Sequence, residues 1–424
     1  MNCEAAQIFL KRHGMAAEDV DPERYIDTML HEMERGLRGE KCSMAMIPAY
    51  LSNDGSVPPG RSAVVIDAGG TNFRSALVTF TGDGYDCEEL RKMKMPGTDK
   101  PCTWAEFISF TADQIEPLLD RADRIGFCFS YSAVITPDMD GCVEKVDKEV
   151  VIKGSEGQLI AASLSAELER RGFTGKRIVI LNDTAAVLLG GAASLDKSRY
   201  SGFVGQVSGT GSNTCVSLPT YKISKLGINS DRGMVVNLES GFYDGIEPGD
   251  FDKQLDSASL VPGAKPFEKM TAGVYLGELC RLMLCAAAEE GLLSPEGSEK
   301  VRAMGSIDSS VIDAWASGEG FENIGDDPGD RDFAQTVSLA VFKRAARLMC
   351  VNLVALTLLA DAGRDRPMCV LAEGSLVDRG RHFRPELLRQ LALHGKEKRG
   401  LDIELILGHG STLPGSAAAA LLNG

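Results

Sequence analysis

The chain has 424 residues, of which 44% are hydrophobic and 25% charged, and its net charge is −15. This length exceeds what one hydrophobic core usually supports, so we expect two domains of ordinary size. The acidic balance disfavours nucleic acid and anionic membrane surfaces as partners, because both attract basic patches. It still allows a magnesium–nucleotide, whose phosphates are held by local donors.

The cysteines and the most apolar stretch bear on the location of the protein. The 11 cysteines are scattered without a C-x-x-C pair, and the 5 histidines show no zinc spacing. Reduced thiols in a cytoplasmic protein are therefore expected. The most apolar stretch, residues 345–360, is interrupted by Arg347 and Asn352, which predicts a buried helix and no membrane span.

The first predicted elements are a helix and a glycine-rich hairpin. Apolar residues at helical spacing predict a helix over 26–37, and residues 52–60 form a loop. An apolar run then ends at Asp67, and a second run leaves at Phe73. Between them, Gly69 and Gly70 expose backbone N–H groups that suit phosphate, and Asp67 is placed to hold magnesium directly or through water. The alternative is an ordinary hairpin turn with an Asp at its rim.

A buried strand over 177–181 is followed by Asn182, Asp183 and Thr184 at the start of a helix. Catalytic groups often follow a strand in this way, so Asp183 is a candidate. The alternative is a helix N-cap.

Residues 202–219 repeat the strand–loop–strand pattern around 209–213, which suggests two related halves or, alternatively, a second plain turn. Long helices are predicted over 267–286 and 331–360, and strands near 367–375 and over 401–407. Strands that alternate with helices define an α/β class.

These motifs, in this order, resemble the hexokinase family within the actin-like sugar kinases. The matching elements are D-x-G-G-T-N-F-R at 67–74, N-D-T at 182–184, G-T-G-x-N at 209–213, N-x-E at 237–239 and F-E-K-M at 267–270. Y-L-G-E-L at 275–279 follows, and Arg344, Gly374–Ser375 and Gly410–Ser411 match later elements more loosely.

The resemblance implies a two-domain, actin-like (ribonuclease H-like) sugar kinase fold with an interdomain cleft. The small domain would comprise residues 61–183 and 412–424, and the large domain residues 1–60 and 184–411. The cleft would bind ATP, magnesium and a hexose. The protein would be a monomer or homodimer.

The resemblance also assigns roles to single residues. Asp183 would be the general base, and Asp67 would help to place magnesium. The hexose would contact Ser130, Lys148, Asn182, Asp183, Asn237, Glu239 and Glu268. The nucleotide would contact Asp67, Gly69, Gly70, Thr71, Asn72, Arg74, Gly209, Thr210, Gly374, Ser375 and Gly410.

Two departures concern the sugar site. Ser130-Tyr131-Ser132 stands where the family has S-F-P, and Asp147-Lys148 stands where it has Thr-Lys. Lys145 and Lys153 are alternatives if the register differs. The expected reaction is transfer of the γ-phosphoryl group of ATP to the 6-hydroxyl of glucose or a close relative. The alternatives are a non-catalytic sugar sensor and a kinase for an altered hexose such as an amino sugar.

Overall fold

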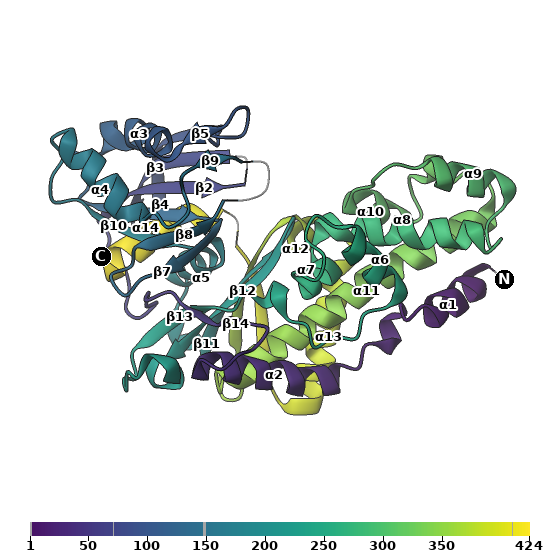
Figure 1. The fold of residues 1–424 in the computed structure, drawn as a ribbon. Helices are drawn as coiled ribbons and strands as arrows, with labels where there is room; N and C mark the ends of the chain where they lie inside the picture. Colours follow the sequence, from purple (N-terminus) through teal and green to yellow (C-terminus); the bar gives the residue numbers. More distant parts are fainter. Residues whose placement is uncertain (1, 71, 147–149, 409) are drawn as a thin grey trace.

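The computed structural model describes residues 2–70, 72–146, 150–408 and 410–424 and contains two large β-sheets in two lobes (Figure 1). Helices cover both faces of each sheet, which confirms the expected α/β class. Among the described residues, no helix combines the length and apolar character needed to cross a bilayer.

The first sheet has five strands in the order β10-β6-β2-β3-β4. β2 is antiparallel to β3, whereas β6 and β10 run parallel to β2. Helices α3 (Trp104–Ile115) and α4 (Ile160–Arg170) cover one face, and α5 (Asp183–Ala193) and α14 (Thr412–Asn423) the other. The strands are β2 (Ser62–Gly69), β3 (Asn72–Phe80), β4 (Tyr85–Lys94), β6 (Arg124–Phe129) and β10 (Arg177–Leu181).

The second sheet has six strands in the order β1-β13-β12-β11-β14-β15. One face packs on the 32-residue helix α11 (Pro328–Leu359), which Asp327 caps through the N–H groups of its first turn. The other face packs on α5. The strands are β1 (Ile47–Pro48), β11 (Gly202–Ser208), β12 (Ser212–Pro219), β13 (Gly233–Asn237), β14 (Met368–Glu373) and β15 (Ile403–Leu407).

The remaining elements surround these sheets. The predicted helix over 26–37 lies within α2, and the one over 331–360 corresponds to α11. The single helix predicted over 267–286 is wrong, because Ala272 is extended (φ −88°, ψ 140°) and separates two helices. The α-helices outside the two sheets' own layers are α1 (Asn2–Arg12), α2 (Pro22–Arg38), α6 (Asp250–Ala258), α7 (Pro266–Thr271), α8 (Gly273–Glu289), α9 (Pro295–Ala303), α10 (Ser309–Ala316), α12 (Ser375–Arg379) and α13 (Phe383–Leu391). Short strands outside the two large sheets are β5 (Cys102–Thr103), β7 (Ser132–Ile135), β8 (Gly141–Lys145) and β9 (Ile152–Lys153).

Helix α5 lies between the two sheets, and α14 packs on the first sheet and touches α5 through backbone. A Cβ on Gly415 would stand 1.9 Å from the carbonyl oxygen of Ala186, and one on Gly190 would stand 2.2 Å from that of Ser411. Gly126 on β6 approaches the carbonyl of Ser416 equally closely. These glycines therefore set how near α14 comes to both neighbours. The division into 61–183 plus 412–424 and 1–60 plus 184–411 stays a prediction.

We expect Gly415→Ala to lower the free energy of unfolding by about 1–3 kcal/mol, because the added methyl group overlaps the Ala186 carbonyl. The higher helix propensity of alanine alone would raise the free energy of unfolding by about 1 kcal/mol. The sign of the measured change therefore tells whether steric overlap or helix propensity dominates. Thermal unfolding followed by circular dichroism measures the change. Gly82→Ala is the control, since no atom lies within 4 Å of its added carbon. A Gly415→Ala protein at least as stable as its parent would contradict this close contact.

Candidate active site

The parallel strands of the first sheet bring several predicted residues to one edge. Leu181, Cys128 and Asp67 lie side by side on β10, β6 and β2. The residues that follow, including Ser130, Asn182 and Asp183, therefore leave the sheet at the same edge. Burial raises the pKa of the Cys128 thiol well above its usual value, and the negative charges of Asp67 and Asp183 raise it further. Both carboxylates thus lie near this thiol.

Asp67 is buried and held by Arg74. The Nε atom of Arg74 donates to Oδ2 of Asp67 at 2.7 Å, and a second guanidinium N–H donates to the same oxygen. Burial nevertheless raises the pKa of Asp67, while the charge of Arg74 opposes the rise. Both of these bonds use Oδ2, and the Cys128 thiol also hydrogen-bonds to the Asp67 carboxylate. Arg74 contacts Asp67 and orients this carboxylate.

The hairpin turn after Asp67 depends on Gly70 and Tyr131. Gly70 has a left-handed backbone (φ 53°), which glycine adopts without strain. Its carbonyl accepts a hydrogen bond from the buried Tyr131 hydroxyl. Tyr131, a departure from the family pattern, therefore anchors the turn. Asn72 begins the next strand and is exposed, whereas Thr71 lies outside the described residues.

Asn182 and Asp183 form the N-terminus of α5. The Asn182 side-chain oxygen accepts from the Thr184 N–H at 3.0 Å and from its hydroxyl at 2.7 Å, so Asn182 is the N-cap. Oδ1 of Asp183 also accepts from the Thr184 N–H, at 2.8 Å. The N-cap interpretation therefore holds for Asn182, and Asp183 follows as a partly exposed carboxylate with a fixed orientation.

A polar network joins α5 to the second sheet. The Thr184 hydroxyl lies 3.2 Å from Oδ1 of Asn237, which also accepts from the Asn213 amide at 2.9 Å. The Asn237 amide donates to Oε1 of Glu239 at 2.6 Å, and the Asn213 amide approaches the same oxygen at 3.2 Å. Asn213 has no role among the predicted site residues, although it ends the G-T-G-x-N loop. It positions both Asn237 and Glu239.

Two carboxylates and a lysine lie beside this network. Burial raises the pKa of Glu239, and the nearby charge of Glu268 adds to the rise. Lys265, which sequence reasoning missed, places Nζ 3.8 Å from Oε1 of Glu268 and 5.6 Å from the Phe242 ring centroid. Ser212 N–H lies 3.5 Å from the other Glu268 oxygen. Carboxylates and amides at this spacing suit a ligand with adjacent hydroxyl groups.

The second sheet brings together the loops predicted for the nucleotide. β11, β14 and β15 are parallel, so Gly209, Gly374 and Gly410 follow neighbouring strand ends. Gly374 has φ 122°, and a Cβ there would stand 2.3 Å from the Ser208 carbonyl oxygen. Thr210 and Ser375 are exposed. The Glu373 carboxylate accepts from the Ser411 N–H and joins two of these loops.

The lysine expected at the sugar lies outside the described residues. This applies to Lys148 and to its neighbour Asp147. The alternatives Lys145 and Lys153 end β8 and β9 and are both exposed. The choice between them stays a prediction.

In the described ranges, no three His, Cys, Asp or Glu side chains gather into a metal site. Magnesium keeps several waters and is often held by one or two carboxylates together with substrate phosphates. Asp67, a single carboxylate beside a glycine turn, fits that kind of binding.

Sequence comparison covers nearly the whole chain. A family model described as hexokinase matches residues 203–422, and a second one with the same description matches residues 10–193. Hexokinase from Schistosoma mansoni is 30% identical over 294 residues, which are 65% of this chain and 63% of that protein. Hexokinase-1 of Saccharomyces cerevisiae is 28% identical over 347 residues, which are 77% of this chain and 70% of that protein. The match to the schistosome protein thus spans less than two thirds of its length.

Comparison with solved structures finds the same fold in two hexokinases. A crystal structure titled hexokinase matches with a TM-score of 0.82 and 21% identity over 99% of both chains. Schistosoma mansoni hexokinase complexed with glucose matches with a TM-score of 0.77 and 23% identity, over 98% of this chain and 99% of that one.

The fold is therefore the two-domain α/β fold of hexokinases, as predicted. With matching family models on both halves, the chain belongs to the hexokinase family of phosphotransferases. The roles of the single site residues stay predictions.

We expect Glu239→Gln to raise the melting temperature of the ligand-free protein at about pH 7.5. The folded state raises the pKa of Glu239 above its ordinary value of 4.5, so ionisation above the raised pKa costs stability. The gain in melting temperature should shrink as the pH falls through the raised pKa of folded Glu239. It should vanish below the pKa that Glu239 has in the unfolded chain. A glutamine oxygen still accepts from Asn237 and Asn213.

Melting temperatures across this pH range test the expectation. The control is Glu322→Gln at an exposed site, which should show no comparable pH-dependent gain. A Glu239→Gln protein that is less stable at every pH would show that the ionised carboxylate stabilises the fold.

Proposed function

We propose that the protein is an ATP-dependent hexokinase that phosphorylates the 6-hydroxyl of glucose or a close relative. The observation that carries this proposal is the position of Asp183. It stands where the edge of the first sheet meets the polar network of the second, linked through Thr184. Phosphoryl transfer needs such a group to orient and deprotonate the attacking hydroxyl.

In this proposal Asp183 is the general base. The Thr184 N–H holds Oδ1 of Asp183 and so fixes the plane of the carboxylate. The carboxylate accepts the proton of the hexose 6-hydroxyl as the oxygen bonds to the γ-phosphorus, and ADP leaves. A positioned base of this kind contributes about 10²- to 10⁴-fold in rate.

The hexose would be bound by the polar groups around Asp183. Asn237 and Glu239 are already oriented by Asn213, so little side-chain freedom is lost on binding. A site that pairs with each hydroxyl also rejects sugars that lack one. The full set is Ser130, Lys148, Asn182, Asp183, Asn237, Glu239 and Glu268.

The nucleotide would lie between the two glycine loops. Backbone N–H groups near Gly69 and Gly209 would donate to phosphate oxygens. Magnesium at Asp67 would neutralise phosphate charge. The remaining contacts would come from Gly70, Thr71, Asn72, Thr210, Gly374, Ser375 and Gly410, with Arg74 acting through Asp67.

The alternatives differ in what they require. A sugar sensor needs neither the base nor the phosphate loops, yet Asp67, Asp183 and Thr210 are all present. A kinase for a cationic amino sugar is disfavoured by Lys265, whose ammonium group lies beside Glu268. Cytoplasmic location and a monomeric or homodimeric state also belong to this proposal.

Asp183→Asn should lower kcat by about 10²- to 10⁴-fold while hexose binding stays within a few-fold, because the amide keeps the shape but cannot accept the proton. Coupled measurement of ADP release gives kcat, and calorimetry gives hexose affinity. Asp196→Asn is the matched control, since this residue also accepts an N–H bond at the start of a helix. Activity of Asp183→Asn within a few-fold of the parent would remove Asp183 as the base.

Lys265→Gln should raise the ratio of kcat/KM for glucosamine over glucose by about two- to fivefold, the size of a partly exposed charge interaction. A panel of hexoses with ATP and magnesium provides the parent values. Lys253→Gln, at an exposed site on α6, should leave the ratio unchanged. No ADP release with any hexose would instead favour the sensor.

A further inference from the structure

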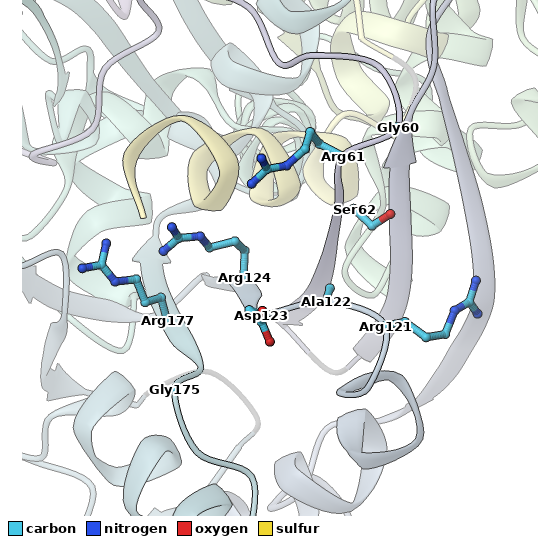
Figure 2. Close-up of a pocket in the computed structure, with 9 residues that line it drawn as sticks. All are labelled: Gly60, Arg61, Ser62, Arg121, Ala122, Asp123, Arg124, Gly175 and Arg177. Atoms are coloured by element: carbon cyan, nitrogen blue, oxygen red, sulfur yellow. The ribbon is translucent and has the colours of Figure 1, made fainter.

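A hollow of about 510 Å³ lies at the edge of the first sheet opposite the candidate active site (Figure 2). This edge is where β2, β6 and β10 begin, whereas their other ends carry Asp67 and Asp183. Four arginines and one aspartate are among its lining residues: Arg61, Arg121, Asp123, Arg124 and Arg177.

Three of the arginines share one face of the sheet. Arg177 and Arg124 are direct neighbours on β10 and β6. The pairing of Val64 with Ile125 places Arg124 beside Ala63, two residues from Arg61. Alternation along a strand therefore puts all three side chains on the face that α14 covers. Figure 2 shows their guanidinium groups in a row near α14 and that of Arg121 on the other side.

These three guanidinium groups form no ion pair in the part of the chain that the structure describes; Lys176 is the main cause of the lowered pKa of the lining residue Asp123, and the charge of Arg124 adds to it at longer range. No ion pair or side-chain hydrogen bond involves the side chains of Arg61, Arg124 or Arg177 there. By contrast, Arg121 pairs with Glu88 at 2.6 Å, and Asp123 pairs with Lys176 at 2.8 Å. The pocket is thus strongly positive although the whole chain carries −15.

Helix α14 explains only part of this charge. Gly424, just after the helix, lies against Val179, two residues along β10 from Arg177. A helix C-terminus carries roughly half a negative charge, and an α-carboxylate at Gly424 would add one more. Three guanidinium groups exceed this and repel one another, so the cluster suits a further anion.

We propose that this arginine pocket binds a small anion with several phosphate groups, such as a polyphosphate or a phosphorylated metabolite. Guanidinium groups bind phosphate oxygens in pairs, and three of them match an anion with more than one phosphate. The volume falls within the range of small-molecule sites. The overall acidic charge opposes long polyanions such as nucleic acid. The proposal does not rest on the proposed catalytic function.

Calorimetric titration with sodium tripolyphosphate in the presence of EDTA tests the pocket in solution. The double variant Arg124→Gln/Arg177→Gln should bind at least about tenfold more weakly than the parent, because charge-assisted bonds are lost. The control Arg232→Gln/Arg364→Gln removes the same charge at exposed sites elsewhere and should bind as the parent does. Equal binding by the Arg124/Arg177 variant and the parent overturns the proposal.

A second measurement locates the anion, since the candidate active site also has phosphate loops. Crystals soaked in tungstate should show anomalous density between Arg124 and Arg177. Density at the glycine loops alone overturns the proposal. Density at the arginines without any heat from tripolyphosphate in solution identifies an adventitious ion only, and also overturns it.

Discussion

Helix α5 is packed between the two sheets, and the arrangement of the site depends on this packing. Its residues from Ala185 to Leu189 are all buried, in a core that contains strands of both sheets. A helix that is apolar on all sides has no solvent face and must lie inside. Because α5 begins at Asp183, burial of its body fixes where this carboxylate stands relative to both sheets. The position of the candidate base is thus set by hydrophobic packing.

The carboxylates of the candidate site lie in surroundings that solvate their ionised forms poorly. Burial raises the pKa of both Asp67 and Glu239, which means that their ionised forms are poorly solvated in the ligand-free protein. Arg74 offsets part of this at Asp67, and the amides of Asn237 and Asn213 offset part of it at Glu239. In the proposed function these groups bind hydroxyls and a cation, and the protein would keep them for that purpose at some expense to stability.

Local patterns in the sequence were sufficient for most of the elements but not for the contacts between them. The glycine hairpins, the strand before Asp183 and the long helix α11 follow from periodicity and turn residues. The Tyr131–Gly70 bond and the bonds of Asn213 to Asn237 and Glu239 join distant residues, so no local pattern predicts them. Lys265 and Glu268 are three residues apart, so this pair was a local signal that sequence reasoning missed. The break at Ala272 was missed because apolar spacing continues across it. Arg61, Arg124 and Arg177 lie far apart in sequence, so only the register of the strands brings them together.

The contact between α5 and α14 differs from most helix pairs because it is made by backbone. At Gly415 and Gly190 the two backbones approach so closely that no side chain fits between them. Ridges and grooves normally fix a crossing angle, since side chains must withdraw before one helix can move along the other. Where glycines replace the ridge, backbone contact fixes the register, because a residue with a Cβ cannot take the place of Gly415 against the Ala186 carbonyl. The glycines that bring α5 and α14 closest together therefore also fix the place along each helix at which the two can meet.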